Sequence, residues 1–398
     1  MTDPEVGARI ARWRRRRGLS QVALAGLVGR SESWLSQVER GLRHVDSLAV
    51  LRDLSRVLRV DLEMLAPSPM ATPRGSNGPA HPVLKQALLA PPIADSTAAT
   101  PAAAPVTTTE VSAMHLAYQD ARYGDVLTAL PTISVQLAGT GDPRMLAAGW
   151  AVVAKMLTKT GSWDLALLAA DRAREAAYRS GDRADLGMAA FQVVCALLPT
   201  SRAAIGEDLA TRTAHHLTPD NARDSGGVDA ADDAAVRSVA GALWLIAAIA
   251  AARRSDTDAA ADRLDRAHHL AQAVGRDANL RWTAFGPTNV ALHRVTVAAE
   301  LGDAPAAITA AHRLDPSRFP APLRGRRVQA GLDLAWAYTC RRRDADAVLA
   351  LLEVERAAPD ATRHNVYARS TISTLLGRAR GSTGGHIRGL ATRNHVTL

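Results

Sequence analysis

The sequence predicts an all-α protein, and three observations support this fold class. From about residue 111 onward, alanine and leucine recur at helical spacing beside polar faces. No segment shows the sustained apolar–polar alternation of a half-buried strand. Short turns, each followed by an alanine- and leucine-rich segment, recur at intervals of 37 to 49 residues and begin at Gly124, Gly161, Gly206, Ser255, Gly302 and Arg343.

Residues 1–65 are predicted to form a five-helix domain. They hold 12 arginines against 8 acidic residues, a net charge of +4, and the run from Arg14 to Arg17 is unbroken. The first predicted helix takes its apolar face from Ile10 and Trp13. The helices that close the core take theirs from Leu48, Leu51, Leu54, Leu58, Leu62 and Leu65.

Within this domain, one segment predicts two short helices joined by a tight turn. Ser20 is a suitable N-cap for a helix over residues 21–28, because its hydroxyl can accept from a free backbone N–H of the first turn. Gly29 permits the turn, and Ser31 can cap a second helix that runs to Arg40. The first helix is expected to turn inward Ala23, Leu24 and Leu27.

The second helix has an apolar face and a polar face. Leu35 and Val38, three residues apart, are expected to face the core. The opposite face carries Glu32, Ser33, Ser36 and Gln37. Two short helices of this kind, the second polar on its exposed side, suit the major groove of DNA.

These residues resemble the lambda-repressor-like (XRE) family of helix-turn-helix domains. The resemblance covers roughly Val6 to Leu65. It implies binding of double-stranded operator DNA and a structural ion pair between Arg14 and Glu39. The positions that carry it are Gly7, Arg14, Gly18-Leu19-Ser20-Gln21, Leu24-Ala25, Gly29, Leu35-Ser36 and Glu39-Arg40-Gly41.

The same resemblance implies four base-facing side chains. Glutamine can bond adenine bidentately, and glutamate can accept from cytosine N4. Gln21 could instead contact only a phosphate or its own helix terminus, and Glu32 could act only on the helix N-terminus. The four positions are Gln21, Glu32, Ser33 and Gln37.

Other residues of the motif are candidates for contacts with the DNA backbone. Trp34 could press on a sugar–phosphate strand, or it could pack against the neighbouring helix. Ser36 shares the exposed face of the second helix. Flanking basic side chains, which could also form a solvated face, are expected to contact phosphates. They are Arg30, Arg40 and Arg43.

Residues 66–110 differ in composition and are expected to form a linker. Nine of the 20 prolines lie here, among Ala, Ser, Thr and only four charged residues. Such a segment buries too little apolar surface to offset its ordering entropy. The stretch from Val83 to Leu89 is an exception that could form one or two helical turns.

Residues 111–398 are expected to form a helical-repeat domain. A period near 40 residues with two helices per unit is typical of a solenoid. An irregular all-α domain is the alternative. The stretches Phe285–Arg294 and Gly325–Ala335 resemble the tetratricopeptide-like domains that follow this helix-turn-helix in many actinobacterial regulators. That resemblance implies a homodimer and a site for a peptide or small-molecule effector.

Two helix faces in this domain, each combining aromatic and polar side chains, are candidates for a ligand pocket. Pro287 is placed to open a helix whose N-terminus could hold an anion, with aromatic and amide groups nearby. The second face consists of Arg326, Gln329, Asp333 and Trp336, which follow one another at spacings of 3, 4 and 3 residues. Ordinary core packing with a solvated polar edge is the alternative. The candidate residues are Trp282, Phe285, Asn289, His293, Arg326, Gln329, Asp333 and Trp336.

Other function classes find little support. We see no Walker loop, HExxH, GxSxG or paired-carboxylate context, so we expect no enzyme, cofactor or metal site. Cys195 and Cys340 form no metal-ligand spacing. Because there is no uninterrupted 18-residue apolar run, we expect no membrane span and a cytoplasmic, nucleoid-associated protein.

The sequence therefore predicts a DNA-binding transcription regulator. It is expected to act as a homodimer, because one reading helix contacts only a few base pairs. The alternative is a signalling or scaffold protein whose helical repeats bind other proteins. Arginine dominance suits phosphate and guanine recognition but also follows from a GC-rich genome. The only lysines among the 48 basic residues are Lys85, Lys155 and Lys159.

Overall fold

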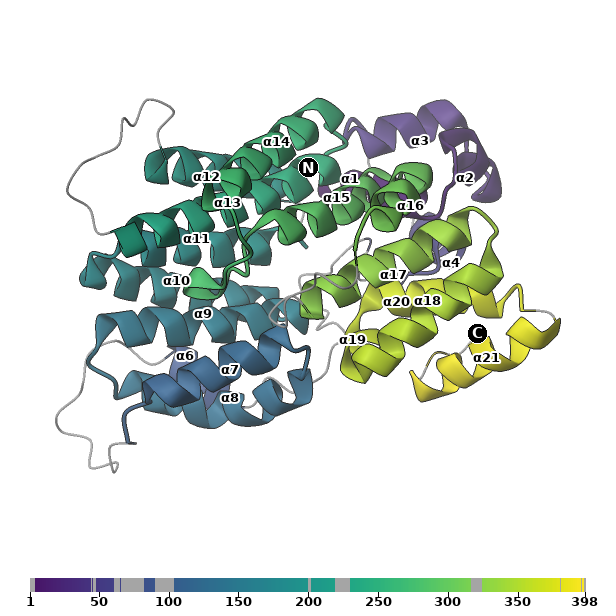
Figure 1. Ribbon diagram of the computed structural model, residues 1–398. Helices are drawn as coiled ribbons and strands as arrows, with labels where there is room; N and C mark the ends of the chain where they lie inside the picture. The colour runs from purple at the N-terminus through teal and green to yellow at the C-terminus, as the bar shows by residue number, and fades with distance from the viewer. Residues whose placement is uncertain are drawn as a thin grey trace.

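The computed structural model describes most of the chain, which folds into two parts. The described residues are 4–43, 45, 48–60, 65, 82–89, 104–199, 202–218, 230–315, 324–379, 381–394 and 396. Within them, all regular secondary structure is helical, as the sequence predicts (Figure 1). Helices α1 to α4 form a small N-terminal bundle, and α6 to α21 form a larger body, here named the helical array.

The N-terminal bundle has one apolar core. Its helices are α1 (Pro4–Arg16), α2 (Gln21–Leu27), α3 (Glu32–Glu39) and α4 (Leu48–Leu58). Ile10, Trp13 and Leu54 are buried together at its centre. The expected fifth helix lies outside the described residues except for Leu65, which is helical and fully buried in the same cluster.

The expected orientation of α2 is wrong in part. Leu24 is buried as predicted, but Ala23 and Leu27 face solvent, and Leu27 is 61% exposed. The buried positions are Leu24, Ala25 and Val28, which share one helix face at spacings of one and three residues. Ala23 and Leu27, four residues apart, therefore share the opposite side.

The first half of the helical array is a stack of antiparallel helices. In Figure 1 it rises from α8 at the bottom to α14 at the top. Its members are α6 (Pro82–Leu89), α7 (Thr108–Gln119), α8 (Tyr123–Ala138), α9 (Pro143–Lys159), α10 (Trp163–Ser180), α11 (Arg183–Leu197), α12 (Ala203–Leu217), α13 (Ala230–Arg253) and α14 (Thr257–Val274).

The second half follows a short 3-10 turn, η1. It lies on the right in Figure 1, where the green to yellow helices descend from α15 to α21. The turn η1 spans Leu280–Trp282. The members of the second half are α15 (Pro287–Leu301), α16 (Ala304–His312), α17 (Arg324–Cys340), α18 (Asp344–Ala357), α19 (Pro359–His364), α20 (Val366–Leu376) and α21 (Gly381–Arg393).

Most of the predicted turns precede helices. Asp256 and Asp303 cap α14 and α16 by accepting from the third residue beyond them. The turn expected at Gly206 is wrong, because this residue lies inside α12. Gly206 faces Val194 and Leu197 of α11, where a Cβ would be in ordinary van der Waals contact.

The helix predicted between Val83 and Leu89 is present as α6. Leu84 and Leu88 are buried in the core that α6 shares with α8 and α10. This part of the expected linker is therefore packed against the helical array. Residues 66–81 and 90–103 lie outside the described residues.

One described helix, α13, is long and apolar enough to cross a membrane, but its surroundings are those of a core helix. Over Asp232–Arg253, 89% of the apolar window is buried inside the protein. The helix packs against α11, α12, α14 and α15.

The helical array curls back on itself. Each helix from α7 to α21 packs against the next one along the chain, and α17 also contacts α7 while α19 contacts α8. The apolar core of α6 to α10 continues into α17 to α21. This closure places α17 opposite α7, α9 and α11, with a cavity between them.

Candidate nucleic-acid interface

Serine caps fix the start of α2 and α3. Ser20 Oγ accepts a hydrogen bond from the backbone N–H of Ala23 at 3.0 Å, and Ser31 Oγ accepts from Trp34 at 3.1 Å. Gly29, between the helices, has a φ of +64°, which favours glycine. The caps and the turn predicted from the sequence are therefore confirmed.

The α3 helix has a buried face and an outward face. Leu35 and Val38 are buried, as predicted. On the other side, Glu32 and Ser33 are exposed, whereas Ser36 and Gln37 are half-buried. In Figure 1, α2 and α3 lie at the outer edge of the molecule. The polar face of α3 is thus available to a partner outside the chain.

A charged network holds α1, α2 and α3 together. Arg14 donates from Nε and Nη2 to the two carboxylate oxygens of Glu39, at 2.6 and 2.8 Å. Gln21 Nε2 donates to the same carboxylate at 2.7 Å. The ion pair implied by the resemblance is present. Gln21 is anchored to Glu39 at the start of α2.

A close helix crossing sets the position of α3. A Cβ on Gly7 of α1 would lie 1.8 Å from the carbonyl oxygen of Val38. No side chain fits in that space, so only glycine allows α1 and α3 to approach this closely. The crossing therefore requires glycine at position 7.

The tryptophan and the arginines of the motif have different environments. Trp34 is 9% exposed, and the Arg30 guanidinium lies 5.6 Å from the centre of its ring. This burial favours packing for Trp34 over contact with DNA. Arg30, Arg40 and Arg43 are exposed around the motif.

These elements have the geometry of a DNA-reading motif: two short capped helices, a tight glycine turn and an outward polar face. Residues 5–67 match the family model of the helix-turn-helix domain. The N-terminal bundle is therefore a helix-turn-helix domain, and the described remainder of the chain is all-helical. No curated protein and no solved structure matches the chain.

The predicted ligand-binding residues do not share one pocket. Trp282, Arg326 and Gln329 line the cavity between α7, α9, α11 and α17, which measures about 170 Å³. Phe285 and His293 are buried, Phe285 in the core around α13. Both side chains fill the interior of the helical array, so a ligand could reach them only by displacing part of that core.

The N-terminus of α15 does not offer the anion site expected there. Asp277 accepts from the backbone N–H of Thr288 at 3.0 Å and from its hydroxyl at 2.6 Å. Asn289 is directed to the backbone and donates to the carbonyl of Ala284 at 3.0 Å. The carboxylate of Asp277 therefore already occupies this helix end.

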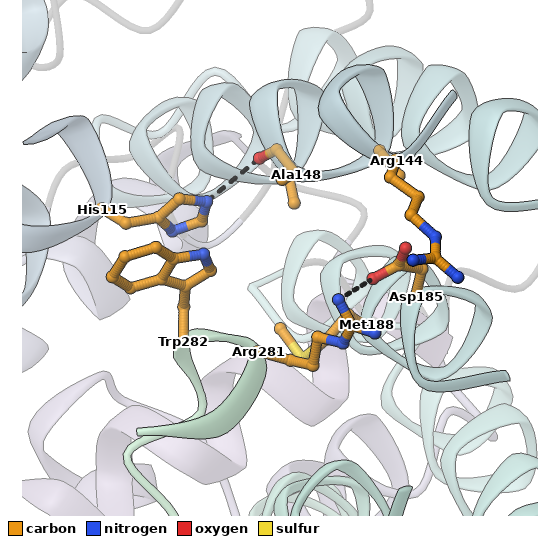
Figure 2. Close-up of a pocket in the computed structure, with 9 residues that line it drawn as sticks. His115, Arg144, Ala148, Asp185, Met188, Arg281 and Trp282 are labelled. Atoms are coloured by element: carbon orange, nitrogen blue, oxygen red, sulfur yellow. Dashed lines mark hydrogen bonds and ion pairs between the residues drawn. The ribbon is translucent and has the colours of Figure 1, made fainter. Parts of the chain in front are cut away.

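The indole of Trp282 separates the large cavity from a smaller one. It stacks on His115 with ring centres 4.7 Å apart (Figure 2). The smaller cavity, about 60 Å³, also contains Arg144, Asp185 and Arg281. Burial raises the pKa of Asp185 to about 6, although Arg281 lies 3.5 Å away.

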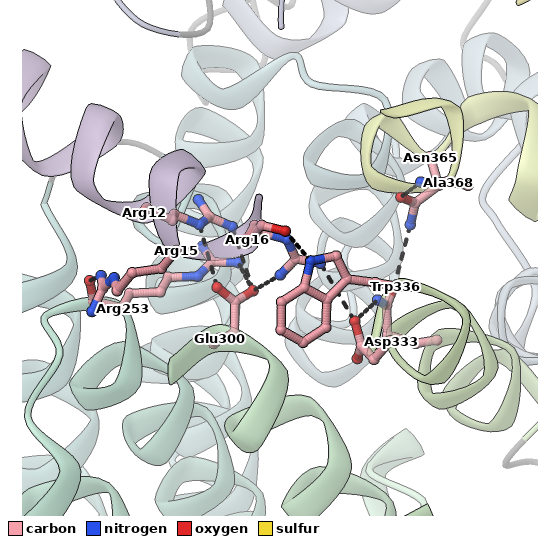
Figure 3. Close-up of polar contacts among 10 residues, drawn as sticks. Arg12, Arg15, Arg16, Arg253, Glu300, Asp333, Trp336, Asn365 and Ala368 are labelled. Atoms are coloured by element: carbon pink, nitrogen blue, oxygen red, sulfur yellow. Dashed lines mark hydrogen bonds and ion pairs between the residues drawn. The ribbon is translucent and has the colours of Figure 1, made fainter. Parts of the chain in front are cut away.

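Asp333 and Trp336, the last two predicted ligand residues, face the helix-turn-helix domain. Trp336 Nε1 donates to the backbone carbonyl of Arg16, whose guanidinium lies over the indole (Figure 3). Asp333 lies 3.6 Å from Arg16. Burial raises the pKa of Asp333 to about 6, against the opposing effect of Arg16.

Glu300 of α15 is the centre of this domain contact. Its carboxylate lies 3.3 Å from Arg12, 3.4 Å from Arg16 and 3.3 Å from Arg253 (Figure 3). Burial alone would raise the pKa of Glu300, but Arg12, Arg253 and Arg16 hold it well below its usual range. Three guanidiniums thus converge on one buried anion.

Much of the basic run therefore binds the helical array. Arg15 donates to Ser255, and Arg17 donates to Thr374. Arg59, after α4, donates to the carbonyl of Ser373 at 2.9 Å. Arginines that the sequence offers as nucleic-acid ligands therefore in large part contact other residues of the same chain.

Proposed function

We propose that this protein is a sequence-specific transcription regulator that reads operator DNA with α3 in the major groove. The observation that carries the proposal is the division of α3 into two faces. Its inner face is fixed by the crossing at Gly7 and by the Arg14–Glu39 pair. Its outer face presents polar side chains with exposed arginines beside it, which suits base contacts flanked by phosphate contacts.

The helical array is proposed to act as a tetratricopeptide-like repeat domain that holds a homodimer. Packing of each helix on its sequence neighbours supports repeat architecture. Two α3 helices, one from each subunit, would supply the sequence specificity that a single helix of this size lacks. The proposal assigns the protein no catalytic role and places it on DNA in the cytoplasm.

Selection from a library of random duplex DNA tests the proposal. We expect the full-length protein to enrich one shared motif, with two related half-sites if the dimer is correct. The double variant Ser33→Ala, Gln37→Ala should lose the enrichment. Gln86→Ala changes an exposed glutamine of α6 and should retain it.

Two results would contradict the proposal. One is enrichment without a motif, and the other is a motif that survives replacement of Ser33 and Gln37. Either would favour a scaffold protein that binds other proteins through its helical array.

A further inference from the structure

The cavity between α7, α9, α11 and α17 has an aromatic wall. Tyr118, Tyr123, Phe191 and Trp282 all line it. Its volume of about 170 Å³ is close to that of an engineered apolar cavity of about 150 Å³ that binds benzene. The space therefore accommodates a group of roughly one aromatic ring.

The polar part of the cavity is basic. Lys155, Lys159 and Arg326 line it, and no aspartate or glutamate does. None of the three forms an ion pair with a carboxylate among the described residues. Burial raises the pKa of both Tyr118 and Tyr123 to about 12, so the phenols stay neutral at neutral pH. Burial lowers the pKa of Lys155 to about 7 and that of Lys159 below its usual value, because the lining holds no anion that would stabilise the two ammonium groups.

The cavity also holds polar groups without partners. Gln192 of α11 is 1% exposed, and neither its Nε2 nor its Oε1 has a hydrogen-bond partner. The hydroxyl of Thr158 is also buried without a partner. Because native proteins satisfy almost all buried polar groups, such a cluster indicates a missing binding partner.

One wall of the cavity is formed by strained backbone. Arg281, Trp282 and Ala284 all have φ between +48° and +60°, although none is glycine. A pair of amide hydrogen bonds between Gln119 and Asn279, at 2.9 and 3.0 Å, holds this segment on α7. Strain of this kind concentrates at ligand sites, where the surrounding structure imposes it.

We propose that this cavity binds a small organic anion in which a carboxylate or phosphate is attached to an aromatic or apolar group. Lys159 and Arg326 would bind the anionic head, and Gln192 would supply a hydrogen bond to it. The aromatic wall would enclose the apolar part. This site goes beyond DNA binding, and its occupancy does not depend on the proposed function.

Gln329 connects the cavity with the helix-turn-helix domain. It lines the cavity, and its Nε2 donates to Asp333 Oδ1 at 3.3 Å. Asp333 in turn lies 3.6 Å from Arg16 of α1. A ligand that takes the amide of Gln329 would change the partners of Asp333 and so the docking of α1. This regulatory step rests on the proposed function.

Isothermal titration of the full-length protein with phenyl phosphate, benzoate and inorganic phosphate tests the site. We expect at least one of the two aromatic anions to bind more tightly than inorganic phosphate. Arg326→Gln should weaken binding about tenfold or more, the size of one lost charge-assisted hydrogen bond. Arg324→Gln makes the same change on the exposed start of α17 and should have little effect.

Several outcomes would overturn the site. These are no binding by any of the three anions, equal binding by the two arginine variants, and a preference for inorganic phosphate over both aromatic anions. Circular dichroism and thermal unfolding of Arg326→Gln show whether it is folded. Should it unfold, Lys159→Gln provides the same charge removal from α9.

The regulatory step has its own readout. The bound anion should change the affinity of the wild-type protein for its selected DNA, and Gln329→Ala should reduce that change while the anion still binds. Binding of the anion without any effect on DNA would overturn the link through Gln329 alone. Failure to select a DNA motif would contradict the proposed function and leave the anion titration as an independent result.

Discussion

Trp336 of α17 donates a hydrogen bond from its indole to the backbone carbonyl of Arg16, the last residue of α1. The Arg16 guanidinium lies 5.6 Å from the centre of the same indole. The end of α1 is therefore bound to the helical array by backbone and side chain together. These contacts fix the position of the helix-turn-helix domain on the helical array.

Glu300→Gln should destabilise this domain contact. The substitution leaves the buried Arg12 and Arg16 and the half-buried Arg253 without their shared anion. Breaking a buried ion pair on one side costs on the order of 3 kcal/mol. Chemical unfolding of the full-length protein measures the loss. Glu353→Gln, on an exposed position of α18, should change the free energy of unfolding little. Equal stability of the two variants would show that Glu300 does not hold the domains.

Asp333→Asn should behave in the opposite way, with a dependence on pH. Because the folded protein raises the pKa of Asp333 to about 6, its contribution to stability is complete at low pH and is lost as the pH rises through 6. Asparagine stays neutral beside Arg16 and Glu300. The variant should therefore gain stability relative to the wild type between pH 5 and pH 8, as measured by urea unfolding. A difference that does not vary with pH would contradict this pKa.

Gly7→Ala should disturb the packing of α3, the proposed recognition helix, on α1. The new Cβ would meet the carbonyl of Val38, and overpacking of this kind costs about 1–3 kcal/mol or more. Gly26→Ala is the matched control, because a Cβ there meets nothing within 4 Å, and alanine should stabilise α2 by about 0.5–1 kcal/mol. Thermal unfolding should thus shift in opposite directions. Shifts in the same direction would show that the crossing tolerates a side chain.

Gln37→Ala should weaken operator binding by about 1–3 kcal/mol and relax the preference at one base position. Binding to unrelated DNA should hardly change, since phosphate contacts supply it. Fluorescence anisotropy with the selected duplex and its single-base variants measures both effects. A uniform loss on all sequences would assign Gln37 to the DNA backbone.

The helix-turn-helix domain could be predicted because its determinants are local. Ser20 and Ser31 lie directly before the helices they cap, and Arg14 is 25 residues from Glu39 within a recognisable pattern. The orientation of Leu27 was harder to predict, because a seven-residue helix is too short for its apolar spacing to define a face.

The domain contact could not be predicted from the sequence. Arg12 and Glu300 are 288 residues apart, so nothing local distinguishes Arg12 from an arginine that binds phosphate. The anion cavity did leave a signal that sequence reasoning missed. Lys155 and Lys159, two of only three lysines, lie four residues apart and share one face of α9, a helix of mostly apolar residues.

The crossing at Gly7 and the hydrogen bond from Trp336 lie on the same helix, α1. A continuous series of contacts therefore connects the helical array through α1 to α3. In a dimer held by the array, the distance between the two recognition helices would be set by folded protein. Half-sites separated by whole turns of about 10 base pairs would fit such a pair, whereas an added half turn would place one half-site on the opposite side of the duplex.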